Sequence, residues 1–429
     1  GISTDSRTIG EGNLFIPIVG EKYDGHDFIG NAIKAGAIAT LSDRSLKGKD
    51  IPYIKVKDTE DALINIAKYY RTKFDIPAIA ITGSSGKTTT KEMVAAVLSQ
   101  SFNVLKNEGN YNNTIGLPHA IFKLNKDHDI CVMEMGMNSF GEISKLASIV
   151  KPDLALVTNI GTAHIEFLGS RENIFKAKME VVENFTSRNT LIINGDDDML
   201  KAFDRNSFSI ISVGLESEND IIAYDIKQID NKGIEFSVRY KNKSERFYIP
   251  VIGIHNVYNG LFGIAAGLYK DMSLENIKKG LAGFTPPDMR METFVLKNGI
   301  RIINDAYNAN PESVRAAIIT LANIQSKAKK ILVLGDMMEL GKYSENEHYK
   351  IGKFAACNNI DLLITIGERS KRTQQGALQA GLPEAFHFEN NKKGLDYLLS
   401  RLLPYDIVLI KGSRSAKMEE IAYLLHEGR

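Results

Sequence analysis

The sequence predicts an α/β protein built from three consecutive domains. Its 429 residues point to roughly three domains, because a typical domain has about 150 residues. Short apolar runs alternate with stretches of helical spacing, which is typical of mostly parallel sheets covered by helices. Prolines interrupt this pattern at Pro77 and in 284-FTPPDMRME-292. We therefore expect a small α/β N-terminal domain over 1–75, a central P-loop-type domain over 76–285 and a Rossmann-like C-terminal domain over 286–429.

Composition argues against several functional classes. Apolar residues make up 43% of the chain, charged residues 24%, and the formal net charge is +1. This balance, without a long run of Lys and Arg, does not favour nucleic acid as a partner. No apolar run approaches the roughly 18 residues of a membrane helix. Cys131 and Cys357 are too few and too far apart for a Cys-based zinc site. They fit a reducing compartment, with Cys131 buried as an inert thiol in the apolar run 130-ICVM-133.

The first two expected domains differ in their elements. In the N-terminal domain, 13-NLFIPI-18 alternates like a strand, 20-GEKYDGHDF-28 is rich in turn residues, and 60-EDALINIAKYYRTK-73 has helical spacing. In the central domain, parallel strands are expected at 78-AIAIT-82, 129-DICVMEM-135, 153-DLALVTNI-160 and 190-TLIIN-194. Between about 208 and 252 short strands without helices indicate an antiparallel patch inside the same domain. The run 196-DDD-198 fits a turn and a helix start better than a metal site.

The C-terminal domain repeats the alternation after the linker 284–292. Strands are expected at 300-IRIINDAY-307, 330-KILVLGDM-337, 361-DLLITIGE-368 and 405-YDIVLIKG-412. The stretches 334-LGDMMELG-341 and 411-KGSR-414 follow two of these strands. Ligands gather at the carboxyl ends of strands in open α/β sheets, so both stretches are candidate substrate contacts.

The stretch 82-TGSSGKTTT-90 predicts a phosphate-binding loop. A strand that turns through glycines into a helix presents free N–H groups and the helix dipole to an anion. Gly83 and Gly86 permit the tight turn, Lys87 can place its charge on phosphates, and Thr88 can offer its hydroxyl to Mg²⁺. Ile81 stands where the strict P-loop pattern has its first glycine, so only the shorter T-G-x-x-G-K-T form is present. The loop residues expected to contact the nucleotide are Gly83, Ser84, Ser85, Gly86, Lys87, Thr88 and Thr89.

Further motifs accompany this loop along the chain. The central part contains 107-NEGNYNNTIGLP-118, 133-MEMGMNSFGEI-143, 159-NIGTAHIEFLGS-170 and 176-KAKMEV-181. The later part adds 255-HNVYN-259, 304-NDAYNANPES-313 and 334-LGDMMELG-341. Together these motifs resemble the Mur ligases, the ATP-dependent amide-forming enzymes of peptidoglycan synthesis. The resemblance covers essentially the whole chain. The family usually has a further short segment before the position of Gly1, so we expect one upstream.

The resemblance implies a ligase that uses ATP and Mg²⁺. The last two motifs resemble the branch that joins D-alanyl-D-alanine to UDP-N-acetylmuramoyl-tripeptide through an acyl phosphate. Such an enzyme would act as a cytoplasmic monomer in cell wall synthesis, on which cell shape and division depend. Three alternatives stay open. The ligase that adds the third amino acid shares the 3-STDSR-7 style of N-terminus; the D-N-P-R motif of its diaminopimelate-specific members is missing here, but its lysine-specific members lack that Arg too. The others are a folylpolyglutamate synthetase and a non-catalytic ATP-binding assembly protein.

Four residues carry the expected catalytic chemistry. The resemblance implies that Lys87 neutralises phosphate charge and that Thr88 and Glu134 hold one Mg²⁺. It places His164 on a second Mg²⁺ and implies that Lys178 is carbamylated, which turns an ammonium cation into an anion that can bind metal. Carbamylation requires a neutral amine, which burial favours. The alternative for Lys178 is a surface lysine paired with Glu180 or Glu183.

The remaining candidate residues are substrate contacts. The resemblance places Asn256 and Asn259 beside the nucleotide, Arg290 towards its phosphates and Asp305 towards its ribose. Since Arg290 and Asp305 belong to the expected C-terminal domain, ATP would bridge two domains. The other candidates are Ser6 and Arg7 for the UDP-sugar, Asn110, Asn112 and Asn113 for the muramoyl-peptide, and Arg414 for the carboxylate of D-alanyl-D-alanine.

Overall fold

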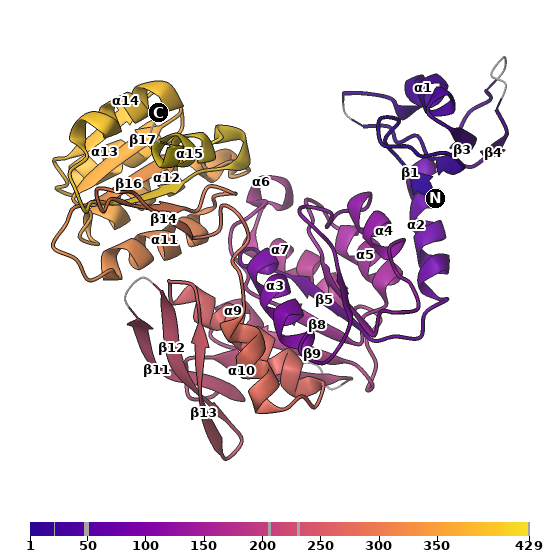
Figure 1. Cartoon of the computed structure of the whole chain (residues 1–429), viewed down its shortest axis with the longest axis horizontal. Coiled ribbons are helices and arrows are strands. Elements are labelled where there is room, and N and C mark those ends of the chain that lie inside the picture. Colours follow the sequence, from indigo (N-terminus) through magenta and orange to yellow (C-terminus); the bar gives the residue numbers. More distant parts are fainter. Residues whose placement is uncertain (21, 47–50, 205–206, 230–231, 428–429) are drawn as a thin grey trace.

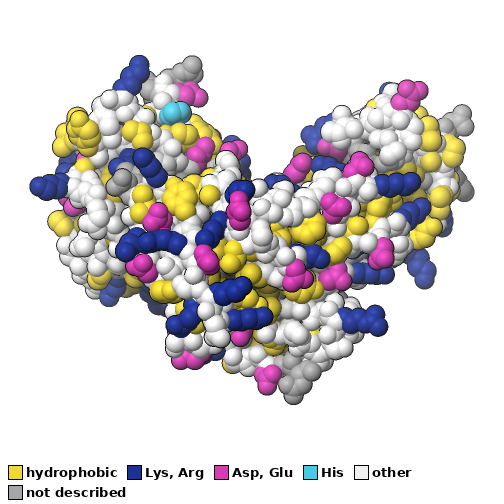
Figure 2. All heavy atoms as spheres, turned by 60° about the horizontal axis from the view of Figure 1, so that its bottom comes forward, with side chains coloured by type: hydrophobic (Ala, Val, Ile, Leu, Met, Phe, Trp, Pro, Cys, Tyr) yellow, Lys and Arg dark blue, Asp and Glu magenta, His cyan; other side chains and the backbone are white. Residues whose placement is uncertain are grey.

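The chain folds into three lobes that follow one another along the sequence (Figure 1). A computed structural model describes residues 1–20, 22–46, 51–204, 207–229 and 232–427, and these residues form three sheets. The N-terminal and C-terminal lobes stand on either side of the middle lobe, and the surface is hollowed between them (Figure 2). Within the described part of the chain, no helix combines the length and apolar composition needed to span a bilayer.

The N-terminal lobe contains a small sheet of parallel strands in the order β1-β2-β3-β4. Its elements are β1 (Ile2–Ser3), β2 (Asn13–Phe15), η1 (Gly25–Phe28), α1 (Ile29–Lys34), β3 (Ala37–Ser42) and β4 (Tyr53–Lys55). The strand expected over 13–18 ends earlier, before Pro17, which has no N–H to donate to a neighbouring strand.

Helix α2 (Thr59–Arg71) joins this lobe to the middle lobe. It agrees with the helix expected over 60–73. Leu63 packs into the core of the N-terminal lobe, whereas Ile64 and Ala67 belong to the core of the middle lobe. The helix therefore belongs to the packing of both lobes.

The middle lobe is built on a sheet in the order β13-β12-β11-β10-β9-β8-β5-β7-β6. Its strands are β5 (Ala78–Thr82), β6 (Val104–Lys106), β7 (Ile130–Glu134), β8 (Leu154–Val157), β9 (Thr190–Asn194), β10 (Ser209–Gly214), β11 (Ile221–Ile229), β12 (Gly233–Tyr240) and β13 (Lys243–Ile249). Its α-helices are α3 (Lys87–Leu98), α4 (Gly116–Ile121), α5 (Glu142–Val150), α6 (Ile165–Leu168), α7 (Arg171–Met179), α8 (Asp198–Lys201), α9 (His255–Tyr269) and α10 (Leu274–Ala282).

The expected antiparallel patch is confirmed in part. Strands β11, β12 and β13 pair antiparallel and extend the main sheet. Strand β10 lies inside the range 208–252 but pairs parallel with both β9 and β11. The patch therefore begins one strand later than the sequence indicated, since the parallel part of the sheet continues through β10 to β11.

Two smaller expectations are confirmed in the middle lobe. Asp197 of the acidic run is the N-cap of α8, and its side chain accepts hydrogen bonds from the N–H groups of Met199 and Leu200. Cys131 is fully buried in β7, and burial raises the pKa of its thiol to about 11. A thiol in this state is unreactive at neutral pH.

The C-terminal lobe contains a sheet in the order β14-β15-β19-β16-β17-β18. Its strands are β14 (Glu292–Val295), β15 (Arg301–Asn304), β16 (Lys330–Gly335), β17 (Leu362–Ile366), β18 (Ala385–Phe388) and β19 (Ile407–Lys411). Its helical elements are α11 (Pro311–Asn323), η3 (Gly341–Tyr343), α12 (Ser344–Ala356), α13 (Lys371–Gln379), α14 (Asn391–Arg401), η4 (Arg414–Ala416) and α15 (Glu419–Glu427). All four expected strands are present. The edge strands β14 and β18 were not anticipated, and β14 pairs antiparallel with β15 directly after the linker.

The order of the middle strands decides where a site can form. Strand β5 lies between β7 and β8, and all three run parallel. Their carboxyl ends therefore bring together the loop after β5, Glu134 at the end of β7 and the segment after β8. The strand order therefore brings together three motifs that are far apart in the sequence.

Arg71 should stabilise the junction between α2 and the middle lobe. Its guanidinium donates hydrogen bonds to the carbonyl oxygens of Val150 (3.2 Å), Phe74 (2.5 Å) and Ile76 (2.7 Å). Substituting Arg71→Met keeps most of the apolar volume but leaves these carbonyls without their donor. We expect the free energy of unfolding to fall by about 3 kcal/mol, measured by urea denaturation. The control Asn65→Met changes an exposed residue of the same helix and should have little effect. Equal stability of both variants would contradict this role.

Candidate active site

The loop between β5 and α3 is shaped by its two glycines. Gly83 has φ +145°, and a Cβ there would lie 1.9 Å from the hydroxyl of Thr158. Gly86 has φ +78°, and its Cβ would lie 2.8 Å from Oδ1 of Asn259. Asn159, after β8, accepts a hydrogen bond from the N–H of Ser85 at 2.9 Å. Only glycine fits at both positions, so the loop is held tightly between the segment after β8 and helix α9.

Two lysine amines meet at the carbonyl oxygen of Gly83. Nζ of Lys87 donates to it at 2.9 Å and Nζ of Lys178 at 3.0 Å. Burial lowers the pKa of Lys87, against the opposing charges of Glu134 and Glu339. Burial also lowers the pKa of Lys178, to well below its usual range, and the charge of Lys87 lowers it further. The Lys178 amine is therefore driven towards its neutral form.

Lys178 does not behave like a surface lysine. It is 1% exposed on the inner face of α7. Glu180 instead accepts hydrogen bonds from main-chain N–H groups of Gly141 and Ser144, and Glu183 accepts from the Ser144 hydroxyl. The alternative of a solvent-exposed ion pair is therefore wrong for this residue.

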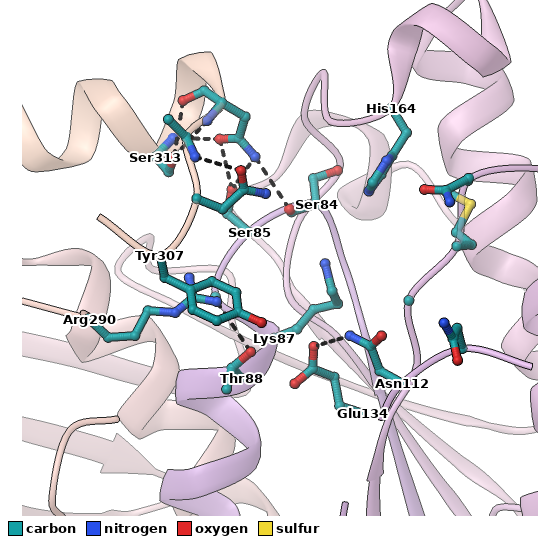
Figure 3. A pocket seen from close by; sticks show the side chains of 18 of the residues that line it. Ser84, Ser85, Lys87, Thr88, Asn112, Glu134, His164, Arg290, Tyr307 and Ser313 are labelled. Atoms are coloured by element: carbon teal, nitrogen blue, oxygen red, sulfur yellow. Dashed lines mark hydrogen bonds between the residues drawn. The ribbon is translucent and has the colours of Figure 1, made fainter. Parts of the chain in front are cut away.

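A cavity opens in front of the loop (Figure 3). Lys87, Thr88, Glu134 and His164 line it from the middle lobe, and Arg290 lines it from the segment just before β14. Oε1 of Glu134 accepts a hydrogen bond from Asn112 at 2.8 Å. Oε2 of Glu134 and Nε of Arg290 are buried without a hydrogen-bond partner among the described residues. A buried acceptor and a buried donor, both unpaired, fit a site that receives a cation and an anion together.

The residues around Glu134 fit Mg²⁺ bound together with phosphate. Among the described residues, no group of three or more His, Cys, Asp and Glu side chains gathers as a self-sufficient metal site. Mg²⁺ is usually held by one or two carboxylates, with phosphates and water as its other ligands. The unpaired carboxylate oxygen of Glu134 and the hydroxyl of Thr88 line the same cavity, which is the donor set that such an ion requires.

The C-terminal lobe closes the cavity with the motif 304-NDAYNANPES-313. Arg290 donates to the Thr88 hydroxyl at 3.4 Å, and its guanidinium carbon lies 4.1 Å from the centre of the Tyr307 ring. Asn310 caps α11 and lies against the phosphate loop, donating to the Ser85 hydroxyl at 3.2 Å. Sequence reasoning named the motif but not Tyr307 or Asn310. Only the docking of the lobes reveals their roles.

Two further contacts between the lobes were not anticipated. Glu312 accepts hydrogen bonds at 2.9 Å from both the N–H and the hydroxyl of Thr162. Oε2 of Glu339 lies 2.7 Å from Nδ1 of His164, so the carboxylate occupies this side of the ring. This contact holds the pKa of Glu339 below its usual value.

A second cavity lies on the other side of Ser85 and Gly86. Its lining includes Thr89, Asn259, Arg290, Asp305 and Lys411. Nζ of Lys411 lies 2.6 Å from Oδ2 of Asp305, and burial lowers the pKa of this lysine. Lys411 was expected to help receive the amino substrate, but its side chain points to Asp305. The two cavities share the loop and Arg290, so one elongated ligand can occupy both.

Asn256 lies behind this second cavity. Its Oδ1 accepts a hydrogen bond from Asn259 at 2.9 Å, and its Nδ2 donates to the carbonyl oxygen of Ile252 at 2.7 Å. Asn259 itself accepts from the Thr90 hydroxyl and lines the cavity. The structure therefore gives Asn256 the position of a residue that orients Asn259.

The three asparagines expected to touch the peptide differ in position. Asn112 and Asn113 line the first cavity. Asn113 also caps the turn into α4, because its Oδ1 accepts from the N–H of Gly116 at 2.7 Å. Asn110 is exposed and is not part of the lining of either cavity.

Three expected substrate residues lie away from both cavities. Ser6 and Arg7 are in the N-terminal lobe, where the 87% exposed side chain of Arg7 pairs with Asp5 at 2.7 Å. Arg414, in η4, pairs with Glu419 at 2.7 Å. None of the three lines the central cavities.

Comparisons with known proteins cover nearly the entire chain. Residues 81–267 match the family model "Mur ligase middle domain", residues 289–414 match "Mur ligase, glutamate ligase domain", and residues 1–71 match "Mur ligase family, catalytic domain". The UDP-N-acetylmuramoyl-tripeptide--D-alanyl-D-alanine ligase of Bacillus subtilis is 39% identical over 98% of this chain and 92% of its own length.

Solved structures agree with these relatives. A crystal structure of MurF from Acinetobacter baumannii superposes with a TM-score of 0.92 at 32% identity, covering 99% of this chain and 93% of that one. The MurF ligase of Thermotoga maritima in complex with ADP has a TM-score of 0.89 at 26% identity, covering 99% of this chain and 97% of that one.

His255 should make stability depend on pH. Its ring is half-exposed and lies beside Asn256, but its Nδ1 is buried, and desolvation lowers its pKa from 6.5 to about 4. As pH falls, His255 therefore binds a proton near pH 6.5 in the unfolded chain but only near pH 4 in the folded chain. The free energy of unfolding thus falls as pH falls from 6.5 to 4. The loss should be on the order of 3 kcal/mol at most. His255→Gln should flatten this part of the curve of unfolding free energy against pH. The control His128→Gln, in a half-exposed loop, should not. A wild-type curve that is flat between pH 6.5 and 4 would refute the assignment.

Proposed function

The chain belongs to the Mur ligase family, and on that premise we propose that it joins D-alanyl-D-alanine to UDP-N-acetylmuramoyl-tripeptide with cleavage of ATP. The terminal carboxylate of the tripeptide attacks the γ-phosphate of ATP, which yields an acyl phosphate and ADP. The amine of D-alanyl-D-alanine then attacks the acyl carbon, forms the amide and releases phosphate. The observation that carries this proposal is the 39% identity to the B. subtilis ligase over 98% of the chain. The product is a precursor of peptidoglycan.

The two adjoining cavities provide the place for ATP. The triphosphate lies along the loop beside Lys87 and meets Arg290, whose Nε has no partner among the described residues. The nucleoside side occupies the second cavity, where Asn259 and Asp305 line the wall. Because these side chains come from two lobes, nucleotide and lobe docking stabilise each other. The docked lobes also keep water from the acyl phosphate.

We further propose that two groups of residues hold Mg²⁺ beside the phosphates. Thr88 and Glu134 would hold one ion, and His164 with carbamylated Lys178 would serve a second. The ions supply positive charge that offsets the charge developing on the transferred phosphoryl group. Lys87 contributes a fixed cation at the same place.

The surroundings of Lys178 support its carbamylation. An ammonium ion would stand in a buried position beside the Lys87 ammonium, and among the described residues its only hydrogen-bond partner would be the carbonyl oxygen that it shares with Lys87. The neutral amine, which this burial favours, is the form that reacts with CO₂. The resulting carbamate is an anion, so it balances Lys87 and offers oxygens to metal.

The other substrates complete the assignment. We assign residues 1–75, 76–285 and 286–429 to UDP-sugar, ATP and amino-substrate binding, respectively. Ser6 and Arg7 would contact the UDP moiety, and Asn112 and Asn113, together with the exposed Asn110, the muramoyl-peptide. Arg414 would exchange its ion pair with Glu419 for the carboxylate of D-alanyl-D-alanine. The protein would act as a monomer in the cytoplasm, where the nucleotide-linked precursor is made.

Substrate coupling tests the proposed reaction. Rapid release of phosphate from ATP should require both UDP-N-acetylmuramoyl-tripeptide and D-alanyl-D-alanine, because the acceptor amine completes the cycle. The tripeptide alone should give only slow release. The measurement is phosphate release with a panel of UDP-muramoyl peptides and amino acceptors. Extension of a UDP-muramoyl-dipeptide by single L-amino acids, with no response to D-alanyl-D-alanine, would show that the assignment is wrong.

Substitution of Lys178 tests the carbamate. Lys178→Ala should lose at least 100-fold in ligation rate, and Lys178→Arg should do no better, because arginine stays charged and cannot form a carbamate. Small carboxylic acids should restore part of the activity of Lys178→Ala by returning an anion to the vacated space. Mass spectrometry of wild-type protein in bicarbonate should detect a labile addition of CO₂.

Lys176→Ala is the matched control for this series. Lys176 lies on the same helix but is exposed, so its loss should leave the rate within about twofold of wild type. A fully active Lys178→Arg variant would exclude the carbamate.

A further inference from the structure

The loop after β16 meets the segment after β8 across the boundary between the lobes. Glu339 belongs to the C-terminal lobe and His164 to the middle lobe, and their side chains approach to 2.7 Å. Both residues have left-handed backbones, with φ +62° for Glu339 and φ +65° for His164. Such conformations are uncommon for residues other than glycine and cluster at functional sites.

Main-chain contacts hold the two segments together. The N–H of Glu166 donates to the carbonyl oxygen of Glu339 at 3.2 Å. Gly341 packs against Glu166, where an added Cβ would lie 3.1 Å from its Cγ. The hydroxyl of Tyr343 donates to the carbonyl oxygen of Gly169 at 3.2 Å. The approach of Glu339 to His164 therefore belongs to a docked interface and does not depend on one long side chain alone.

The contact leaves one ring nitrogen of His164 for the cavity. Glu339 occupies the Nδ1 side, and His164 is part of the cavity lining, where its side chain points towards the Lys87 amine (Figure 3). A histidine that binds metal through one nitrogen commonly has a carboxylate on the other, which fixes the tautomer and the ring orientation. In this chain the carboxylate comes from a different lobe than the histidine.

We infer that Glu339 is a positioning residue that makes the metal-binding orientation of His164 depend on docking of the C-terminal lobe. When the lobes separate, His164 loses the carboxylate that holds its Nδ1 side. When they dock, Nε2 is presented towards the phosphates. This inference rests on the proposed function, because it assumes that the phosphate-side cavity takes divalent metal with a nucleotide. It adds a way in which docking of the C-terminal lobe, which is assigned to the amino substrate, can affect the metal site.

Metal binding without turnover tests the inference. Full-length wild-type protein and variants would be titrated with Mn²⁺ in the presence of β,γ-methylene ATP, and free Mn²⁺ followed by electron paramagnetic resonance. Glu339→Ala should weaken Mn²⁺ affinity by about 10-fold, the lower end of the range for such outer partners of metal ligands. Glu339→Gln keeps an oxygen that can accept from Nδ1–H and should retain affinity within about threefold of wild type. Thermal unfolding of each variant shows whether the fold is intact.

Two controls separate positioning from a general effect on structure. Glu345→Ala changes a highly exposed glutamate at the start of α12 and should bind Mn²⁺ as wild type does. In a His164→Ala background, adding Glu339→Ala should cause no further loss, because Glu339 acts through the ring that is already absent.

Two outcomes would overturn the inference while the proposed function stands. One is wild-type Mn²⁺ affinity in a folded Glu339→Ala protein, and the other is a further loss in the double variant. The ligation assay with wild-type protein decides the proposed function separately. A wild-type protein that binds no Mn²⁺ with the nucleotide analogue would contradict both this inference and the proposed metal sites.

Discussion

The carbonyl oxygen of Gly83 accepts hydrogen bonds from two buried lysine amines, and the organisation of the site depends on how their charge is balanced. Glu134 and Glu339 act electrostatically on Lys87, so that lysine can remain a cation at the phosphates. Lys178 experiences burial and the repulsion of Lys87, and its surroundings favour a neutral amine or an anionic derivative. One carbonyl thus separates a fixed cation from a position that suits negative charge. The tight glycine conformation of the loop brings the two amines to that carbonyl.

Docking of the C-terminal lobe completes the site around the phosphate loop. Arg290, just before β14, and Asn310 and Glu312, at the start of α11, all reach across to the middle lobe. The N-cap of α11 thereby becomes part of the wall around the phosphate loop. Glu339 makes a fourth crossing contact from a different loop. A ligase that must protect an acyl phosphate from water gains from such an arrangement, since its polar groups are assembled only where the lobes meet.

The candidate site was foreseen where local chemistry is unusual. A glycine-rich turn between a strand and a helix has few structural explanations, so Lys87 and Thr88 could be placed at the phosphates from sequence. Glu134 was foreseen from the family resemblance, which its position at the end of a strand supported. Lys178 required the family resemblance, since a lysine within a helical pattern is ordinarily a surface residue. Asn310, Glu312 and Glu339 were not identified individually, because each makes its contact across the lobe boundary. Tyr307 was not identified either, because its place in the cavity lining depends on the same docking.

The sequence by itself determined the three α/β units, most of their strands, the phosphate loop and the family. These features depend on local periodicity, turn residues and short motifs, which neighbouring residues encode. Tertiary structure alone decided that β10 pairs parallel, that Asn256 lies behind Asn259, and that Lys411 faces Asp305. It also decided that Glu339 contacts His164, although 175 positions separate them along the chain. Pairing of distant strands and docking of lobes depend on packing between segments far apart in sequence, and no local pattern in the chain specifies which two side chains will meet there.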